Sequence, residues 1–80
     1  MRNPKAVRRA MITLGENMHR RRKRLHLTQM DAAHRANMAW RHWQKCEAAT
    51  CNACISTLVG IAAALETTLS ELFAETRAVP

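Results

Sequence analysis

The chain has 80 residues, which is enough for a single domain with a modest hydrophobic core. It has 13 Lys and Arg against 6 Asp and Glu, and the resulting net charge of +7 favours a polyanionic partner. A hydrophobic content of 48% argues against wholesale disorder, and no apolar run approaches the length of a transmembrane helix.

The basic charge is concentrated in the first part of the chain. Residues 1–45 contain 12 basic and 2 acidic side chains, whereas residues 46–80 contain 1 basic and 4 acidic side chains. The N-terminal part is therefore suited to a polyanion, and the C-terminal part is not. The first residues lack the apolar segment of a signal peptide, and the three cysteines are an odd number, so we expect a cytoplasmic protein.

The first predicted helix spans about residues 4 to 25. Asn3 is suited to cap its N-terminus, and Pro4 is suited to its first position. Apolar residues recur on one face of this helix: Val7, Met11, Leu14, Met18 and Leu25. Because Gly15 costs about 1 kcal/mol relative to Ala inside a helix, a start near Leu14 is the alternative. Residues 1–13 are accordingly either a basic arm or an extension of this helix.

A second helix is predicted from Thr28 to about Arg35, and a third is predicted over residues 39–47. Thr28 is a suitable N-cap, and Asp31 follows three residues later at the acidic position of a capping box. Asn37 tolerates the left-handed backbone conformation. The sequence therefore predicts a tight turn around Asn37 between two short helices.

Two more helices are predicted after a loop over residues 48–53. Apolar residues share one face of the fourth helix: Ile55, Leu58, Val59, Ala62 and Leu65. Thr68 and Glu71 have the spacing of a capping box, and they open a short fifth helix in which Leu72 and Phe73 are expected to point inward. Strand signals are absent, so the predicted fold class is all-α, a compact five-helix bundle.

Two short helices joined by a tight turn, beside a strong basic bias, form the pattern of a helix-turn-helix. The segments that extend this pattern along the chain are Leu14-Gly15-Glu16, Met18, Arg22, Leu27-Thr28-Gln29, Ala33, Trp43, Glu47, Asn52, Ser56-Thr57-Leu58, Ile61-Ala62, Ala64-Leu65 and Leu69-Ser70-Glu71-Leu72-Phe73. In order and spacing they resemble the phage-repressor/Cro (XRE) family. The resemblance implies a lambda-repressor-like helix-turn-helix domain over residues 14–75, followed by a disordered tail over residues 76–80.

In the docking that this resemblance implies, the third helix lies in the major groove of DNA. Trp43 and Cys46, three residues apart, then face the core. The residues expected to contact bases are Trp40, Arg41, Gln44 and Lys45. Arg can bind guanine through two hydrogen bonds, and Gln can pair with adenine. The alternative is that Arg41 and Lys45 simply belong to a solvated helix face.

The resemblance also implies contacts with DNA phosphates, because helix N-termini favour anions and a basic run ends the first helix. The residues expected to make these contacts are Thr28, Gln29, Ala48, Thr50 and Arg20. Ala48 offers only its backbone N–H for this purpose. The alternative for Thr28 and Gln29 is a simple helix cap.

Two structural roles follow from the same resemblance. Arg22 and Glu47 match a family pair that forms a salt bridge between the first and third helices and would fix the angle of the recognition helix. The candidate dimer interface consists of apolar residues of the fourth and fifth helices that are expected to be exposed: Val59, Ile61, Leu65, Leu69 and Phe73.

Some residues depart from the family pattern. His26, Asn37 and Ala49 stand where glycine is common, and a left-handed backbone costs roughly 1 kcal/mol at a residue such as His or Ala. Ala32 stands in place of a larger aliphatic residue. The space beside Ala32 must therefore be filled from elsewhere, by Met30, Met38 or Trp43.

The cysteines offer two further possibilities. His42, Cys46, Cys51 and Cys54 are four potential zinc ligands, and Cys51-x-x-Cys54 has the spacing of a redox pair. We favour inert thiols, because the family alignment places Cys46 in the core and Cys54 at the N-cap of the fourth helix. We accordingly expect no metal and no cofactor.

Together these features predict a sequence-specific transcriptional regulator that binds a pseudo-palindromic operator in double-stranded DNA as a homodimer. One alternative is an antitoxin-like module whose main partner is a protein, such as a toxin or RNA polymerase. Another is a basic protein that binds nucleic acid or an anionic membrane without specificity. Between these two, we expect nucleic acid and no membrane. No nucleophile–base pair, paired carboxylates or phosphate-binding glycine loop is present, so we expect no enzymatic activity.

Overall fold

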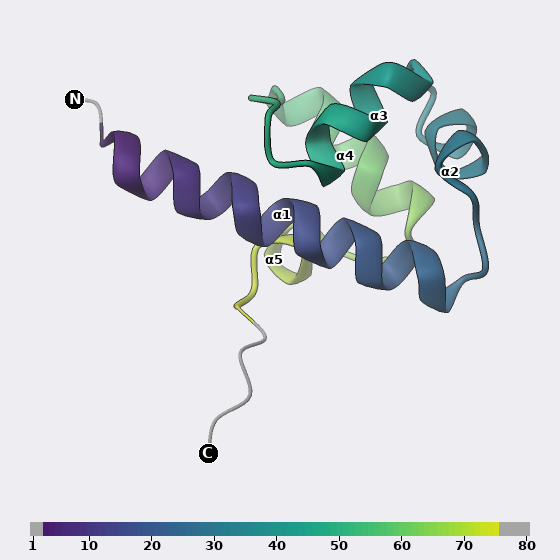
Figure 1. The fold of residues 1–80 in the computed structure, drawn as a ribbon. Helices are drawn as coiled ribbons and strands as arrows, with labels where there is room; N and C mark the ends of the chain where they lie inside the picture. Colours follow the sequence, from purple (N-terminus) through teal and green to yellow (C-terminus); the bar gives the residue numbers. More distant parts are fainter. Residues whose placement is uncertain (1–2, 76–80) are drawn as a thin grey trace.

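The computed structural model describes residues 3–75, and this part of the chain is helical without strands. Its five helices follow the predicted order: α1 Pro4–Arg24, α2 Gln29–Arg35, α3 Trp40–Glu47, α4 Ile55–Ala64 and α5 Leu69–Leu72. The predicted all-α, five-helix fold is therefore confirmed (Figure 1). The predicted disordered tail, residues 76–80, lies outside the described residues. No helix in the described part is both long enough and apolar enough to cross a membrane.

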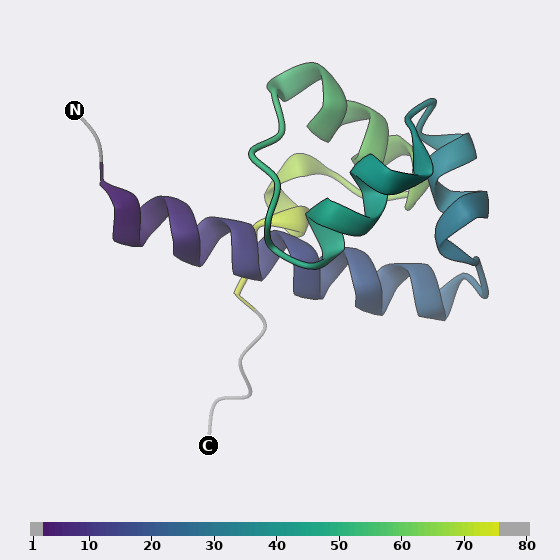
Figure 2. The ribbon, with the colours of Figure 1, turned by 45° about the horizontal axis from the view of Figure 1, so that its top comes forward.

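Helix α1 begins where its cap was predicted. The Ala6 N–H donates to Asn3 Oδ1 over 3.1 Å, and Pro4 occupies the first helical position. The helix runs unbroken through Gly15, so the alternative start near Leu14 is wrong and residues 4–13 extend the helix. Figures 1 and 2 show this N-terminal part of α1 reaching beyond the other helices. Val7 is consequently exposed, whereas Leu14 and Met18 on the same stripe are buried.

Gly15 lies where α1 passes closest to the end of α3. A Cβ at this position would stand 2.6 Å from the carbonyl oxygen of Glu47 and 2.9 Å from that of Cys46. Both neighbours are backbone atoms, which cannot rotate away as a side chain could. Glycine is therefore required here by the contact between the two helices.

The core lies between α1 and the four shorter helices. Its largest fully buried side chains are Trp43, Met18, Ile61, Leu65, Leu72 and Cys46. Ala32 and Ala33 are the buried residues of α2. Of the three residues expected to fill the space beside Ala32, Trp43 lies in the same core and Met38 packs against that core. Met30 is exposed and does not contribute to the core.

Helix α4 presents a different face to the core than the sequence suggested. Leu58, Ile61 and Ala62 of α4 and Leu65 just after it are buried, whereas Ile55 and Val59 are 68% and 51% exposed. The prediction that Ile61 and Leu65 belong to an exposed dimer interface is therefore wrong, because both side chains are at most 1% exposed in the single chain.

Four helices end with the same left-handed turn. His26, Asn37, Ala49 and Glu66 have φ angles of 59°, 55°, 61° and 57° and follow α1, α2, α3 and α4. After α1, the Leu27 N–H donates to the Arg22 carbonyl and the His26 N–H donates to the Lys23 carbonyl, which is the Schellman arrangement. The equivalent bonds follow α2, α3 and α4. The departures from glycine thus do not prevent the expected turns, and Glu66 adds a fourth that was not predicted.

Helix α5 is fixed to α1 through a buried amide. Asn17 Nδ2 donates to the carbonyl oxygens of Leu72 and Ala74, each over 2.8 Å, at the end of α5. At its start, Thr68 Oγ1 accepts from the Glu71 N–H as predicted, but the Glu71 carboxylate turns to Arg21 instead of completing the capping box. Leu72 is buried as predicted, whereas Phe73 is 36% exposed and does not point into the core.

Candidate nucleic-acid interface

Helices α2 and α3 form the helix-turn-helix, with α2 starting at a complete capping box. Thr28 Oγ1 accepts from the Asp31 N–H over 3.0 Å, and Asp31 Oδ2 accepts from the Thr28 N–H over 3.3 Å. After the left-handed Asn37, the chain starts α3 without a side-chain cap at Ala39. The predicted capping box is therefore confirmed, and the Thr28 hydroxyl contributes to it.

The outward face of α3 brings together the four residues expected to contact bases. Trp40, Arg41 and Lys45 are exposed, and Gln44 is half-buried. Together with two neighbours they line one shallow depression: Trp40, Arg41, Gln44, Lys45, Ala48 and Thr50. The structure therefore gathers a guanidinium, an ammonium, an amide and an indole on a single surface of one helix.

The inward face of α3 is held by the buried carboxylate of Glu47. Arg22 Nε and Trp43 Nε1 each donate to Glu47 Oε2 over 2.6 Å. Arg22 Nη2 and Gln29 Nε2 each lie 3.2 Å from Glu47 Oε1. The structure thus brings Arg22 and Glu47 together, and it adds Trp43 and Gln29 as partners that the sequence did not reveal.

This network joins three helices around the Glu47 carboxylate. Arg22 comes from α1, Gln29 from α2 and Glu47 from α3, and Arg22 Nη1 also donates to the Leu27 carbonyl over 2.9 Å. Burial alone would raise the pKa of Glu47, but the hydrogen bonds from Arg22, Trp43 and Gln29 and the Arg22 charge lower it below its usual value. The carboxylate is therefore ionised at neutral pH and fixes α3 relative to α1 and α2.

The sequence spacing along α1 could have revealed one further neighbour of Glu47, namely His19. His19 lies three residues before Arg22 on α1, and its Nδ1 stands 3.3 Å from Glu47 Oε1. Gln29 carried no comparable signal, because its link to Glu47 depends on how two different helices pack. The amide was predicted to bind a phosphate, and in this structure it is bound to Glu47.

The residues expected to contact phosphates differ in what they have available. The Thr50 hydroxyl donates to the Lys45 carbonyl over 3.2 Å and is exposed. The Ala48 N–H donates to the Gln44 carbonyl over 3.0 Å, as part of the end of α3. Because this N–H was the only donor of Ala48, the prediction of a phosphate contact there is wrong.

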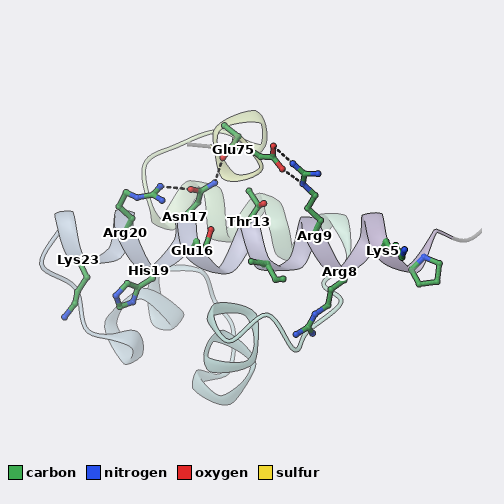
Figure 3. A pocket seen from close by; sticks show the side chains of 13 residues that line it. Lys5, Arg8, Arg9, Thr13, Glu16, Asn17, His19, Arg20, Lys23 and Glu75 are labelled. Atoms are coloured by element: carbon green, nitrogen blue, oxygen red, sulfur yellow. Dashed lines mark hydrogen bonds and ion pairs between the residues drawn. The ribbon is translucent and has the colours of Figure 1, made fainter. Parts of the chain in front are cut away.

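Arg20 lies on the side of α1 that carries α5. Its Nη1 donates to Asn17 Oδ1 over 2.6 Å, and Figure 3 shows it pointing toward Asn17, whereas His19 and Lys23 point to the opposite side of the helix. Arg20 and Lys23 both line a broad groove along α1. Arg9 and Glu75 line the same groove, and they form an ion pair over 2.6 Å. Lys23 is therefore better placed than Arg20 on the side nearer α2 and α3.

The basic residues fall into two groups. Within residues 3–75, six arginines use their side chains inside the molecule, as hydrogen bonds or ion pairs: Arg8, Arg9, Arg20, Arg21, Arg22 and Arg35. In the same part of the chain, the structure shows no side-chain hydrogen bond or ion pair for the remaining basic residues: Lys5, Lys23, Arg24, Arg41 and Lys45. Two of these five cations stand on the outward face of α3.

The structure separates Cys54 from the other two cysteines, so the alternative of a Cys51–Cys54 redox pair gains no support from the geometry. Cys51 lies beside Cys46 and His42, whereas Cys54 is exposed at the N-cap of α4. Hydrogen bonds with the Ser56 and Thr57 hydroxyls lower the pKa of Cys54 to about 6. Among the described residues, His42, Cys46 and Cys51 form a group whose ligand atoms all lie within 4.8 Å of one another.

The fold and this interface define an all-helical domain with a helix-turn-helix whose second helix has an exposed basic face. Among solved structures, the chain is similar to the restriction-modification controller protein C.AhdI from Aeromonas hydrophila, with a TM-score of 0.75 and 21% sequence identity. The similarity covers 79% of this chain and 96% of that chain, and it concerns the fold. Neither a protein-family model nor a curated protein sequence matches the chain.

Proposed function

We propose that this protein is a sequence-specific DNA-binding transcriptional regulator that reads the major groove with α3. The observation that carries the proposal is the outward face of α3, where Arg41 and Lys45 are exposed and have no side-chain partner within residues 3–75, while Glu47 fixes the opposite face. Arginine binds guanine through two hydrogen bonds, and glutamine can pair with adenine, so Arg41 and Gln44 are the proposed specificity residues. The similarity in fold to a restriction-modification controller protein supports this class.

Other cations would contribute affinity that does not depend on sequence. Lys23 and Arg24, at the end of α1, have no internal partner among the described residues and precede the start of α2. Each phosphate that such a side chain neutralises releases counterions and makes binding weaker at higher salt. We retain Thr28, Gln29, Thr50 and Arg20 as proposed phosphate contacts, and Lys23 joins them.

The regulator is proposed to act as a homodimer on a pseudo-palindromic operator. An 80-residue domain has a modest hydrophobic core, so burial of further apolar surface against a second copy would stabilise it. Apolar side chains of the acidic C-terminal part are the candidates for this contact: the exposed Ile55, Val59 and Phe73, and the partly buried Leu69. Two recognition helices would then meet half-sites about 34–36 Å apart.

Selection of bound sites from random double-stranded DNA tests the proposal directly. At about 0.15 M salt, we expect a symmetric site whose affinity exceeds that of bulk DNA by roughly 1000-fold or more. Sedimentation of the complex should give two chains per site. Equal binding to all sequences would contradict specificity, and recovery of asymmetric sites bound by one chain would contradict the dimer.

A further inference from the structure

Three potential metal ligands converge where α3 passes into the loop that leads to α4. His42 and Cys46 are four residues apart on α3, and Cys51 follows in the loop. His42 Nε2 lies 3.1 Å from Cys51 Sγ, and Cys46 Sγ lies 2.9 Å from Cys51 Sγ. Both cysteines are buried, whereas His42 is half-buried. The cluster is thus dry on the side of the sulfurs and open toward solvent on the side of the imidazole.

We propose that His42, Cys46 and Cys51 form a binding site for a zinc ion, with the fourth position taken by water. Two cysteine sulfurs and one imidazole nitrogen are ligands that Zn²⁺ prefers, and an open fourth position is common in sites with three protein ligands. This site does not depend on the proposed DNA-binding function.

The distances support an ion of this size. With Zn–S bonds of about 2.3 Å and Zn–N bonds of about 2.0–2.1 Å, a tetrahedral site separates two sulfurs by about 3.8 Å and a sulfur from a nitrogen by about 3.6 Å. The two sulfurs would therefore move apart by about 0.9 Å, and the imidazole would move by about 0.5 Å from the sulfur of Cys51. The ligand atoms of the remaining pair, His42 and Cys46, lie within 4.8 Å of each other, so no pair has to change its separation by more than about 1.2 Å to reach the tetrahedral geometry.

Protonation of the thiols is the competing state. Cys46 and Cys51 are both buried, and burial disfavours a charged thiolate that has no cation beside it. On binding, each coordinating thiol releases one proton to solvent and forms a metal–sulfur bond in its place. Two thiolates neutralise one Zn²⁺, which leaves the buried site without net charge.

Cys54 is excluded from the proposed ligand set. Its sulfur is exposed at the start of α4 and lies 3.2 Å from Ser56 Oγ and 3.4 Å from Thr57 Oγ1. It is therefore a matched control, since it is a cysteine of the same short segment whose thiol is free of the cluster. Replacing it tests whether any cysteine affects metal binding or only those in the cluster.

The experiment uses the full chain, reduced and freed of metal with a chelator. Zn²⁺ is titrated in competition with a chromophoric chelator, and Co²⁺ is used as a spectroscopic probe of thiolate ligands. We expect one Zn²⁺ per chain with a sub-micromolar dissociation constant, a thiolate-to-cobalt charge-transfer band, and a rise of about 5 °C or more in the thermal midpoint with excess Zn²⁺.

The variants separate the proposed ligands from their neighbours. Cys51→Ser and His42→Gln should each weaken Zn²⁺ binding by about 100-fold or more, whereas Cys54→Ser should bind as the natural sequence does. His42→Gln changes a half-buried residue, so it keeps the test valid if a cysteine variant folds poorly. Less than about 0.2 Zn²⁺ per chain at saturation, an unchanged affinity in Cys51→Ser, or loss of binding in Cys54→Ser would overturn the proposed site.

Discussion

The two faces of α3 differ in what their side chains contact. On the inward face, Trp43 and Cys46 are fully buried and Glu47 binds Arg22 and Trp43. On the outward face, Arg41 and Lys45 are exposed, and the described part of the chain offers them no internal partner. One eight-residue helix therefore separates the residues that hold it from those available to a ligand. Changes on the inward face should alter stability, and changes on the outward face should alter binding.

The largest expected loss of stability comes from Glu47→Ala. This change leaves the Arg22 guanidinium buried without its carboxylate and removes the acceptor of Trp43 Nε1. Removing one partner of a buried ion pair costs about 3–5 kcal/mol of unfolding free energy. Urea unfolding should show this loss.

The control for Glu47→Ala is Glu71→Ala, which breaks a more exposed pair with Arg21 at 3.3 Å. Exposed ion pairs contribute at most about 1 kcal/mol, so this variant should be close to the natural sequence in stability. If both variants lost the same amount, the inward face of α3 would not owe its stability to the Glu47 network.

Gly15→Ala should have the next largest effect. The added Cβ would meet the Glu47 and Cys46 carbonyls, so α3 must shift away from α1. We expect a loss of about 2 kcal/mol, within the range for overpacked sites, although Ala favours helices by about 1 kcal/mol. Glu16→Ala, at the next and exposed position, should change stability by less than about 0.5 kcal/mol. A gain of stability in Gly15→Ala would show that the two helices are not in close contact.

The pH dependence of stability should report the ionised state of Glu47. Because the folded protein lowers the pKa of this carboxyl, its contribution is complete above the unfolded value of about 4.3 and is lost as pH falls below it. Glu47→Gln cannot titrate at this position. The difference in unfolding free energy between the natural sequence and Glu47→Gln should therefore shrink as pH falls from about 6 to 3. Parallel stability curves would contradict the lowered pKa.

The smallest of the stability effects is expected at the turn that ends α3. Ala49 has a φ of 61°, which glycine adopts without strain. Ala49→Gly should therefore raise the unfolding free energy by about 0.5–1 kcal/mol. Ala63→Gly makes the same chemical change at an exposed position inside α4 and should lower it by about 0.5–1 kcal/mol. Thermal unfolding of the two variants should give midpoints on opposite sides of the natural one.

The elements of the fold followed from local signals. Asn3 and Thr28 marked helix starts through their caps, and Asn37 marked a turn through its tolerance of positive φ. Each of these signals acts within three or four residues of the chain, so it can be recognised without knowing the packing.

Packing decided the points at which the sequence was insufficient. Ile61 and Val59 are both apolar residues of α4, and only the position of α4 against the core shows that Ile61 is buried and Val59 exposed. The sequence showed Gly15 only as a residue that weakens a helix. The reason for a glycine there is the close approach of Cys46 and Glu47 of α3, which lie 31 and 32 residues away in the sequence. The partners of Glu47 on α2 depended on packing in the same way.

The central claim is that the outward face of α3 determines which DNA sequence is bound. It is tested most directly by the ratio of affinities for the selected site and for bulk DNA. The two variants to compare are Arg41→Ala/Lys45→Ala and a charge-matched control at the exposed end of α1, Lys23→Ala/Arg24→Ala. We expect the α3 variant to lose about 100-fold in this ratio, with unfolding free energy changed by less than about 0.5 kcal/mol.

The α1 control should weaken binding to both DNAs alike and leave the ratio unchanged, because contacts with phosphates carry no base sequence. A ratio that the α3 variant leaves intact, or that the α1 control lowers equally, would contradict the assignment of α3 as the recognition helix.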